Sequence, residues 1–258
     1  MKFIYPPDYF NTNKIDEFFE AEAIALRNMG FSVAIMNNKE IEKGEYFYRG
    51  WMLNEEEYEN LNDFMLKNDS ILLTNKSNYF NAHYLSNWYD ILKEYTPETI
   101  ITTPLELEKV LKNTEWKNFF IKDFVKSLTT SEGSIANSKE EVLKVIKKIE
   151  DKKGITGGIC LRKVEDFITE SEIRYFSING QVLSPTNEIP EIVNKINELI
   201  DLPFFSIDII KDRSGKDWLV EIGDGQVSDL KYPWTTEKFA QKIKDSIKQK
   251  IKNKRLLK

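Results

Sequence analysis

Two acidic residues lie on neighbouring strand-like segments that together predict a hairpin. The segments are 204–210 and 218–222, and the polar stretch between them ends in Ser214-Gly215. With Ser214-Gly215 as a two-residue loop, Asp208 lies directly opposite Glu221, and with a four-residue loop the two are diagonal neighbours. Both arrangements put the two carboxylates on one face, with directly opposed Cβ atoms about 4.5–5.5 Å apart. Like charges repel at that distance, so a cation is expected beside them.

Magnesium binding is one interpretation of this hairpin face. Mg²⁺ binds a few carboxylates together with water and phosphate oxygens. The candidate ligands are Asp208, Glu221 and Asp224, the last in the run Gly223-Asp224-Gly225. The alternative is a solvated hairpin face, on which acidic residues are common.

Three further strand-like segments each carry a cation among apolar residues. They are Lys122 in FFIKDF, Arg162 in ICLRKV and Arg174 in EIRYF. Each alone fits an edge-strand cation with a buried stem and a solvated head. Together with paired carboxylates they match the charges that a bound triphosphate and Mg²⁺ require. The small polar loop Ser127–Ser134 has backbone N–H groups that can cover phosphates.

Arg49 and His83 are the candidates for substrate binding in the first half of the chain. An arginine can hold a carboxylate with two hydrogen bonds, and a histidine can orient a substrate or carry a proton. The structural alternatives are that Arg49 caps the turn at Gly50, and that His83 starts a helix packed by Tyr84 and Trp88.

Strands and helices alternate in the elements that precede these residues. The predicted elements are a strand at 2–5, a helix at 14–29, strands at 31–36 and 45–49, a helix at 55–67, a strand at 70–73 and a helix at 82–93. This order begins with a βαβ unit. The turn after the first strand is Pro6-Pro7-Asp8 where a Rossmann dinucleotide site needs glycines, so that site is disfavoured.

The pattern changes near Pro97, where we expect a domain boundary. Strands are predicted at 100–101, 119–124, 158–164, 172–178 and 181–183, with helices at 138–152 and 188–200 and another after Pro233. Asn179-Gly180 predicts a tight hairpin turn. The fold class is therefore α/β (α+β), with a βαβ domain over 1–96 and an antiparallel domain over 97–258.

Composition sets further limits. The 258 residues are 41% hydrophobic and 31% charged, which excludes a disordered chain, and the net charge is −5. This charge opposes nucleic-acid binding, and the basic stretch 237–258 fits an amphipathic helix with a solvated tail. One cysteine and one histidine exclude a disulfide framework and clustered cysteine or histidine metal sites. No apolar run approaches about 20 residues and no signal peptide is present, so we expect a cytoplasmic protein without a membrane segment.

The second half of the chain resembles the ATP-grasp superfamily. The resemblance covers about 102–251 and rests on the order of the segments FFIKDFVKS, TTSEGS, GICLRKVEDF, EIRYFSINGQ and FFSIDII followed by WLVEIGDG. In the first half, YFYRGWML and NAHYLSNWY are similar to the pre-grasp region of the clade named for its arginines and lysine, found in bacteria and phages. The resemblance implies an ATP-grasp fold with a pre-grasp domain over 1–96, a small lobe at about 97–160 and a large lobe at about 161–258.

The resemblance also implies roles for individual residues, with ATP and Mg²⁺ as cofactors. Lys122 would contact the α- and β-phosphates, Arg174 the γ-phosphate, the backbone of Lys163 and Val164 the adenine, and Glu165 or Asp166 the ribose. Asp208 and Glu221 match the Mg²⁺ ligands. Many members carry a further asparagine ligand where this chain has Gly223, and Asp224 would substitute for it.

The activity that the resemblance implies is an ATP- and Mg²⁺-dependent carboxylate–amine ligase that acts through an acyl phosphate. Its partners would be small-molecule or peptide carboxylates and amines, with Arg49 and His83 at the substrate. The alternatives are a nucleotide-binding or protein-interaction module without turnover, and a small-molecule phosphotransferase.

Overall fold

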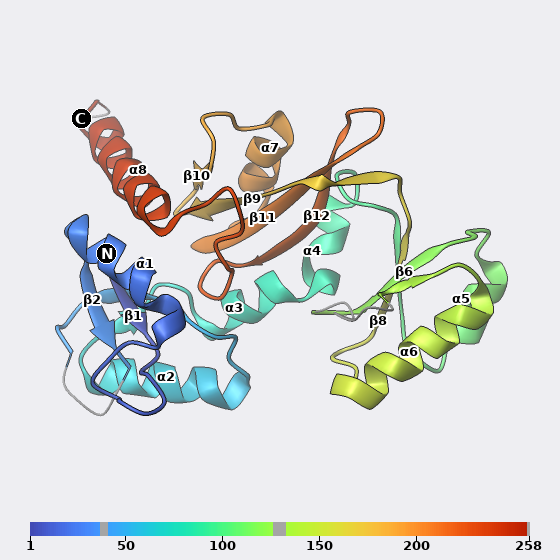
Figure 1. Cartoon of the computed structure of the whole chain (residues 1–258), viewed down its shortest axis with the longest axis horizontal. Coiled ribbons are helices and arrows are strands. Elements are labelled where there is room, and N and C mark those ends of the chain that lie inside the picture. Colours follow the sequence, from blue (N-terminus) through green and yellow to red (C-terminus); the bar gives the residue numbers. More distant parts are fainter. Residues whose placement is uncertain (37–40, 126–132, 257–258) are drawn as a thin grey trace. The chain divides into compact units, whose positions relative to one another are not determined.

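The computed structural model describes residues 1–36, 41–125 and 133–256, which form two compact units (Figure 1). Unit 1 comprises Met1–Ala82, Ile173–Asp208 and Ile222–Lys258, and unit 2 comprises His83–Glu172 and Ile209–Glu221. Most of the polar loop that was predicted to cover phosphates, 127–132, lies outside the described residues. The sequence domains 1–96 and 97–258 remain a prediction.

Unit 1 contains a four-stranded parallel sheet in the order β2-β1-β3-β4. The strands are β1 Lys2–Tyr5, β2 Ser32–Ile35, β3 Glu45–Tyr48 and β4 Ile71–Leu72, and the helices between them are α1 Glu17–Asn28 and α2 Glu55–Lys67. The predicted βαβ start is present. Phe3 and Tyr5 pack with α1, whereas Ile4 packs with α2, because alternate side chains of a strand point to opposite faces. Both faces of the sheet are therefore covered, as is usual for parallel sheets.

Local signals fix where these two helices begin. Asp16 accepts a hydrogen bond from the Phe18 N–H at the start of α1. Asn54 and Glu57 form a reciprocal capping box at the start of α2. The predicted range of α2 agrees with the structure residue for residue.

Unit 1 also contains elements from the second half of the chain. They are β9 Phe167–Ile178, β10 Gln181–Leu183, α7 Glu191–Leu199, β11 Phe204–Asp212, β12 Asp217–Asp224 and α8 Thr236–Leu256. The sheet order is β10-β9-β11-β12, and strands β9, β11 and β12 each continue into unit 2. Phe176, Phe204 and Phe239 join the core that also holds α1. Asn179 and Gly180 both have positive φ, 51° and 76°, as the predicted tight turn requires.

Unit 2 contains a second four-stranded sheet, in the order β5-β8-β6-β7, whose pairs are antiparallel. Its strands are β5 Thr99–Thr102, β6 Phe119–Asp123, β7 Ile135–Ala136 and β8 Ile159–Lys163, and its helices are α4 Leu85–Leu92, α5 Leu107–Asn113 and α6 Lys139–Lys153. Apolar side chains of α5, α6 and one face of the sheet form the core of unit 2. The antiparallel second half was predicted.

The single helix predicted over 82–93 is wrong. Helix α3 spans Lys76–His83, and α4 begins at Leu85 after an extended residue, Tyr84. The Leu85 N–H donates a hydrogen bond to the carbonyl oxygen of Phe124, 2.9 Å away, so a tertiary contact replaces a helical bond at this point. His83 therefore ends a helix instead of starting one.

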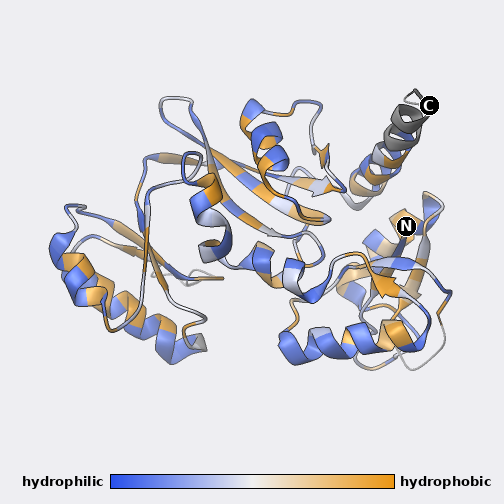
Figure 2. Ribbon diagram, turned by 180° about the vertical axis from the view of Figure 1, so that it is seen from behind, coloured by the Kyte–Doolittle hydropathy of each residue, from blue (hydrophilic) through white to orange (hydrophobic). Residues whose placement is uncertain are grey.

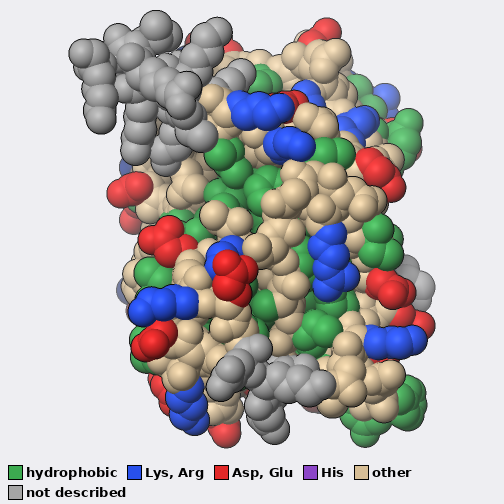
Figure 3. All heavy atoms as spheres, turned by 90° about the vertical axis from the view of Figure 1, so that its left-hand side faces the viewer, with side chains coloured by type: hydrophobic (Ala, Val, Ile, Leu, Met, Phe, Trp, Pro, Cys, Tyr) green, Lys and Arg blue, Asp and Glu red, His purple; other side chains and the backbone are tan. Residues whose placement is uncertain are grey.

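Hydropathy follows these elements. Figure 2 shows both hydrophobic and hydrophilic residues along helices α2 and α6, as expected for helices with one buried side. On the face of unit 1 in Figure 3, acidic and basic side chains are interspersed. No helix within the described residues is long and apolar enough to span a bilayer.

Candidate functional site

Lys122 and Glu221 form an ion pair in unit 2. The Nζ of Lys122 lies 2.7 Å from Oε1 of Glu221, and the lysine side chain is only 4% exposed. The residues next to Lys122 on β6, Ile121 and Asp123, are also buried. Ile121 belongs to the core with α5 and α6, so Lys122 lies on the opposite face of the sheet. The sequence places Lys122 among apolar residues, and the structure shows that its side chain is buried.

Arg162 shares that face of the sheet. Lys122 pairs with Cys160 across the β6–β8 ladder, and Arg162 lies two residues further along β8. Its Nη1 donates to the carbonyl oxygen of Val220 at 2.8 Å, and its Nη2 donates to Oγ1 of Thr96. Burial lowers the pKa of Arg162, and its buried Nε has no hydrogen-bond partner among the described residues. Arg162 thus holds β12 through a main-chain oxygen, and its predicted part in nucleotide binding remains a prediction.

The adenine-binding backbone was predicted at Lys163 and Val164, at the end of β8. The Lys163 N–H donates to the carbonyl oxygen of Glu98 at 2.8 Å, which extends the β5–β8 pairing by one bond. The Lys163 side chain is exposed, and Val164 is half-buried.

The two ribose candidates differ in their surroundings. Glu165 is partly buried, with its carboxylate 3.7 Å from the Lys163 ammonium group. Asp166 is mostly exposed and pairs with Arg213 at 3.0 Å. Only Glu165 therefore has a carboxylate sheltered from solvent.

Arg174 and Asp208 form a bidentate pair in unit 1. The arginine Nε and Nη2 each donate to one carboxylate oxygen at 2.7 Å. The Lys231 Nζ lies 3.2 Å from the same carboxylate, whose side chain is 3% exposed. Arg174 also donates to the carbonyl oxygen of Asp229, and Trp234 Nε1 holds the carbonyl oxygen of Arg174. Arg174, the predicted γ-phosphate contact, thus forms an ion pair with Asp208, a predicted metal ligand.

The strands β11 and β12 are joined by the four residues 213–216, one of the two loop lengths expected from the sequence. At the tip of this hairpin, the Asp212 N–H donates to Lys216 and the Gly215 N–H donates to Asp212, with Gly215 at φ 87°. At the open end, the Gly225 N–H donates to Phe204. That bond fits the register predicted from a two-residue loop, so the two ends of the hairpin differ by one residue. The opposition of Asp208 and Glu221 stays a prediction.

Asp224 is a buried carboxyl group in unit 1. It is 1% exposed, and its Oδ1 accepts a hydrogen bond from the Gln226 N–H at 2.8 Å. Loss of solvation raises the pKa of Asp224 to about 8, against the lowering effect of the Gln226 hydrogen bonds. No basic side chain among the described residues forms an ion pair with it.

Arg49 is buried, and its guanidinium group forms hydrogen bonds to other residues of unit 1. Its Nε and Nη2 donate to the two carboxylate oxygens of Glu22 at 2.7 and 2.6 Å, and its Nη1 donates to the carbonyl oxygens of Gly225 and Ser228. Burial acts to lower the pKa of Arg49, but the Glu22 carboxylate outweighs it and the net shift is upward. Tyr5 OH donates to Glu22 as well. The arginine therefore ties α1 to the segment after β12.

His83, the other predicted substrate residue, is buried at the end of α3. It belongs to unit 2, whereas Arg49 belongs to unit 1. Its role at a substrate remains a prediction.

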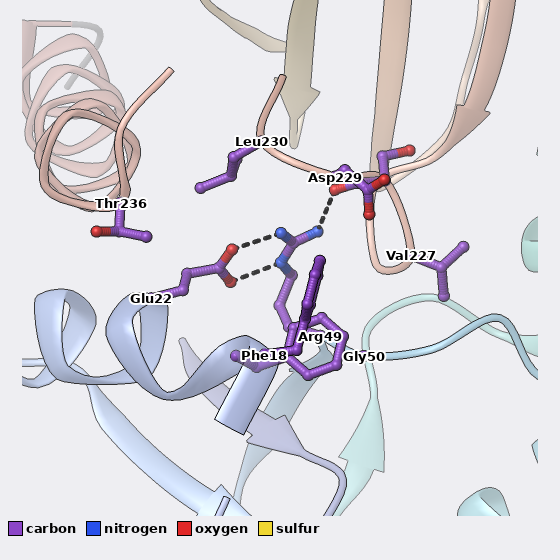
Figure 4. A pocket seen from close by; sticks show the side chains of 10 residues that line it. Phe18, Glu22, Arg49, Gly50, Val227, Asp229, Leu230 and Thr236 are labelled. Carbon is purple, nitrogen blue, oxygen red and sulfur yellow. Dashed lines mark hydrogen bonds and ion pairs between the residues drawn. The ribbon is translucent and has the colours of Figure 1, made fainter. Parts of the chain in front are cut away.

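A pocket of about 250 Å³ opens in unit 1 beside the Arg49–Glu22 pair (Figure 4). In Figure 4, Glu22 on α1 points at the guanidinium group of Arg49, whose other side faces the segment of Asp229. Phe18, Leu230 and Thr236 also line it. Sequence reasoning missed this pocket.

Two charged residues of these clusters were also missed. Glu22 lies among Phe19, Ala23 and Leu26, which are buried at helical spacing. An acid on the apolar stripe of a predicted helix is a signal for a buried partner. Lys231 lies in an irregular segment, and no pattern in the sequence marks it.

The side chains fit a magnesium nucleotide in their chemistry. Each unit presents a carboxylate, a hard oxygen ligand, beside a cation that suits phosphate. The described residues contain no group of three or more histidine, cysteine, aspartate and glutamate side chains placed to hold a metal ion. Mg²⁺ bound with a nucleotide needs only one or two carboxylates.

A family model described as the ATP-grasp domain, R2K clade family 3, matches residues 86–243, which is more than half of the chain. The chain belongs to this ATP-grasp family. The match confirms the resemblance seen in the sequence, and it includes Lys122, Arg174, Asp208 and Glu221.

Solved structures agree on the fold of this ATP-grasp chain. D-cycloserine synthetase DcsG has a TM-score of 0.64 at 13% identity, with 95% of this chain and 99% of that chain covered. The macrocyclase MdnC of Microcystis aeruginosa MRC, bound with the precursor peptide MdnA, has a TM-score of 0.61 at 12% identity, with coverages of 93% and 98%.

A RiPP-associated ATP-grasp ligase of Chryseobacterium gregarium, in complex with ADP and a leader and core peptide, has a TM-score of 0.61 at 13% identity, with 97% of each chain covered. At these identities the likeness establishes the ATP-grasp fold, as predicted. No curated protein matched the sequence. Membership of the family supports the predicted ATP-dependent ligase.

Proposed function

We propose that this ATP-grasp chain is an ATP-dependent carboxylate–amine ligase. The observation that carries the proposal is the family match over 86–243, which contains every residue to which we assign a nucleotide or metal contact. Those residues include two cation–carboxylate pairs, Lys122 with Glu221 and Arg174 with Asp208.

Each residue has a proposed task. Lys122 binds the α- and β-phosphates, and Arg174 binds the γ-phosphate. The backbone of Lys163 and Val164 holds the adenine. Among the ribose candidates, Glu165 is favoured over Asp166 because its carboxylate is partly buried and only loosely paired.

Mg²⁺ would be held by Asp208 and Glu221, with Asp224 as the further candidate. When bound, the ion neutralises phosphate charge and polarises the γ-phosphoryl group. The cations now paired with the two carboxylates then turn to phosphate oxygens, which have the same charge and similar hydrogen-bond geometry. The residues therefore exchange partners without leaving a buried charge unpaired.

The proposed reaction uses no protein nucleophile, because both attacking groups belong to the substrates. A substrate carboxylate oxygen attacks the γ-phosphorus, ADP leaves, and an acyl phosphate forms. An amine then attacks the acyl carbon, inorganic phosphate leaves with one former carboxylate oxygen, and the amine loses a proton as the amide forms. Arg174 stabilises charge on the phosphoryl group in transfer.

The substrates are a small-molecule or peptide carboxylate and an amine. Peptide substrates are supported by neighbours described with precursor peptides bound. We propose a cytoplasmic location, where ATP is available.

The test measures ADP release from ATP and Mg²⁺ in the presence of a mixture of amino acids and peptides. Parallel reactions use the same mixture with its carboxylates blocked or with its amines blocked. Release is expected only when both groups are present. Asp208→Asn and Glu221→Gln are each expected to lower the rate by at least about a hundredfold, the range found when a transition-state charge contact is removed. Asp63→Asn and Glu56→Gln, exposed acids on α2, serve as controls. Full turnover in both site variants contradicts the metal assignment.

A nucleotide-binding module without turnover is the second candidate. Gly223 favours it, because this residue stands where many family members carry a further asparagine ligand. Calorimetry with ATP and Mg²⁺ separates the two: binding without turnover over the whole mixture supports the module, and absence of binding removes both. Phosphate transfer to a small molecule is excluded when an amide product is detected.

A further inference from the structure

The lining of the pocket in unit 1 contains two carboxylates, Glu22 and Asp229, and one cation, Arg49. Arg49 and Glu22 share two hydrogen bonds at the base of the pocket, so their charges cancel. Asp229 also lines the pocket, is exposed, and forms no ion pair with any described residue. The lining therefore carries one negative charge in excess, which attracts a cationic group.

The walls of the pocket are apolar and aromatic. Phe18 and Phe19 come from α1, and Val227 and Leu230 come from the segment after β12. Phe18 is 60% exposed, and its ring packs against that of Trp51 in a tilted arrangement with centroids 4.9 Å apart. Trp51 Nε1 donates a hydrogen bond to the Asp16 carboxylate at 2.9 Å, which orients the indole ring. Such rings attract an organic ammonium group through their faces and its substituent through apolar contact.

Asp229 also connects the pocket to the phosphate-binding side of unit 1. Its carbonyl oxygen accepts a hydrogen bond from Nη1 of Arg174 at 3.2 Å, while its side chain lines the pocket. Asp229 therefore contacts both the pocket and Arg174, the arginine assigned to the γ-phosphate.

The volume limits the ligand. About 250 Å³ is below the range of roughly 300–1,000 Å³ typical of sites for drug-sized ligands. An amino-acid-sized amine fits, with its ammonium group at Asp229 and an apolar or aromatic side chain against Phe18.

We propose that this pocket binds the amine substrate as its ammonium form, with Asp229 as the charge partner and Phe18 as the wall that selects an apolar substituent. This assignment rests on the ligase proposed above and adds the class of its amine. Asp229 takes no part in the chemistry at phosphorus. It holds the ammonium group beside the acyl phosphate until a proton passes to solvent water, and the free amine then attacks the acyl carbon.

Calorimetry with the full chain tests the pocket without turnover. The probes are phenethylammonium, the matched anion phenylpropionate, and the ammonium ion alone, each without ATP. Phenethylammonium is expected to bind, and the other two are not. Asp229→Asn and Phe18→Ala are each expected to weaken binding by about tenfold, whereas Asp63→Asn, an exposed acid elsewhere in unit 1, leaves it unchanged. Equal binding of phenylpropionate, absence of phenethylammonium binding, or indifference to Asp229→Asn overturns the proposal.

Kinetics separate failure of the pocket from failure of the ligase. If amide formation occurs, Asp229→Asn is expected to raise KM for the amine about tenfold and to leave KM for ATP unchanged. An unchanged amine KM overturns the pocket and leaves the ligase intact. Asp229-dependent binding of phenethylammonium in a chain without any ligase activity supports the pocket and refutes the ligase.

Discussion

The buried pair of Arg49 and Glu22 gives a direct test of whether Arg49 serves stability or substrate binding. The two side chains are 3% and 6% exposed, and the arginine also donates to the carbonyl oxygens of Gly225 and Ser228. In Arg49→Met, the glutamate keeps only the hydroxyl of Tyr5 and both carbonyls lose their donor. Removing one partner of a buried pair costs about 3–5 kcal/mol, so a loss of this size is expected in the free energy of unfolding.

A double-mutant cycle measures this coupling. Urea unfolding of Glu22→Gln, Arg49→Met and the double variant is expected to give an interaction energy of at least about 2 kcal/mol, because the double variant leaves no buried charge. Arg213→Met is the matched control: Arg213 pairs with Asp166 on the surface, where both side chains are more than 70% exposed. The control is expected to change stability by less than about 0.5 kcal/mol.

The reasoning is refuted if Arg49→Met costs less than about 1 kcal/mol, the ordinary value for a surface change. It is also refuted if the cycle is additive. Lost ligase activity at unchanged stability would assign Arg49 to the substrate, as the sequence suggested.

Three further predictions follow from single contacts. Asp224 has a folded pKa of about 8, above its unfolded value, so the folded state holds an extra proton and stability falls as pH rises from about 4 to 8. Asp224→Asn keeps the acceptor for the Gln226 N–H and is expected to remove this loss of stability. In urea unfolding without Mg²⁺, the free energy of unfolding of the variant minus that of wild type is expected to grow by about 1.4 kcal/mol per pH unit between pH 5 and 7. A difference that stays constant with pH contradicts this prediction. Gly157→Ala is expected to lower the unfolding midpoint, since a Cβ would lie 2.3 Å from the ring of Phe124 and φ is 79°; an unchanged midpoint shows that the ring can move. Asp212 binds the Ser214 hydroxyl and N–H, which hold its pKa near 2, so Asp212→Ala is expected to speed amide exchange at the hairpin tip above pH 4, and unchanged protection would disprove the contact.

The sequence predicted elements where local chemistry decides the structure. Helix α2 follows from its Asn54–Glu57 capping box and from buried residues at helical spacing, and the turn at Asn179-Gly180 follows from residues that tolerate positive φ. Lys122 and Arg162 lie in strands β6 and β8, as the apolar segments around them predicted.

The sequence did not predict features that depend on contacts between residues far apart in the chain, or on patterns that are too short. The break at Tyr84 depends on the Phe124 carbonyl, 39 positions away from its donor Leu85. The short helix α5 was missed although Leu107 and Leu111 recur at helical spacing, because seven residues give a weak pattern. The pairing of Arg49 with Glu22 could not be predicted, because the two residues are 27 positions apart and on different elements; the substrate role of Arg49 stays a prediction. The sequence left the hairpin loop open between two and four residues, because a glycine with positive φ such as Gly215 suits turns of either length.

Transfer of a heavy oxygen isotope tests the central claim, an acyl phosphate formed by this ATP-grasp chain, most directly. The enzyme is supplied with ATP, Mg²⁺, phenethylamine and a mixture of amino acids labelled with heavy oxygen in their carboxylates. The account predicts that each inorganic phosphate released carries one labelled oxygen and that an equal amount of amide forms. Phosphate released without label, with no amide, would show that ATP is hydrolysed by water and would contradict the ligase.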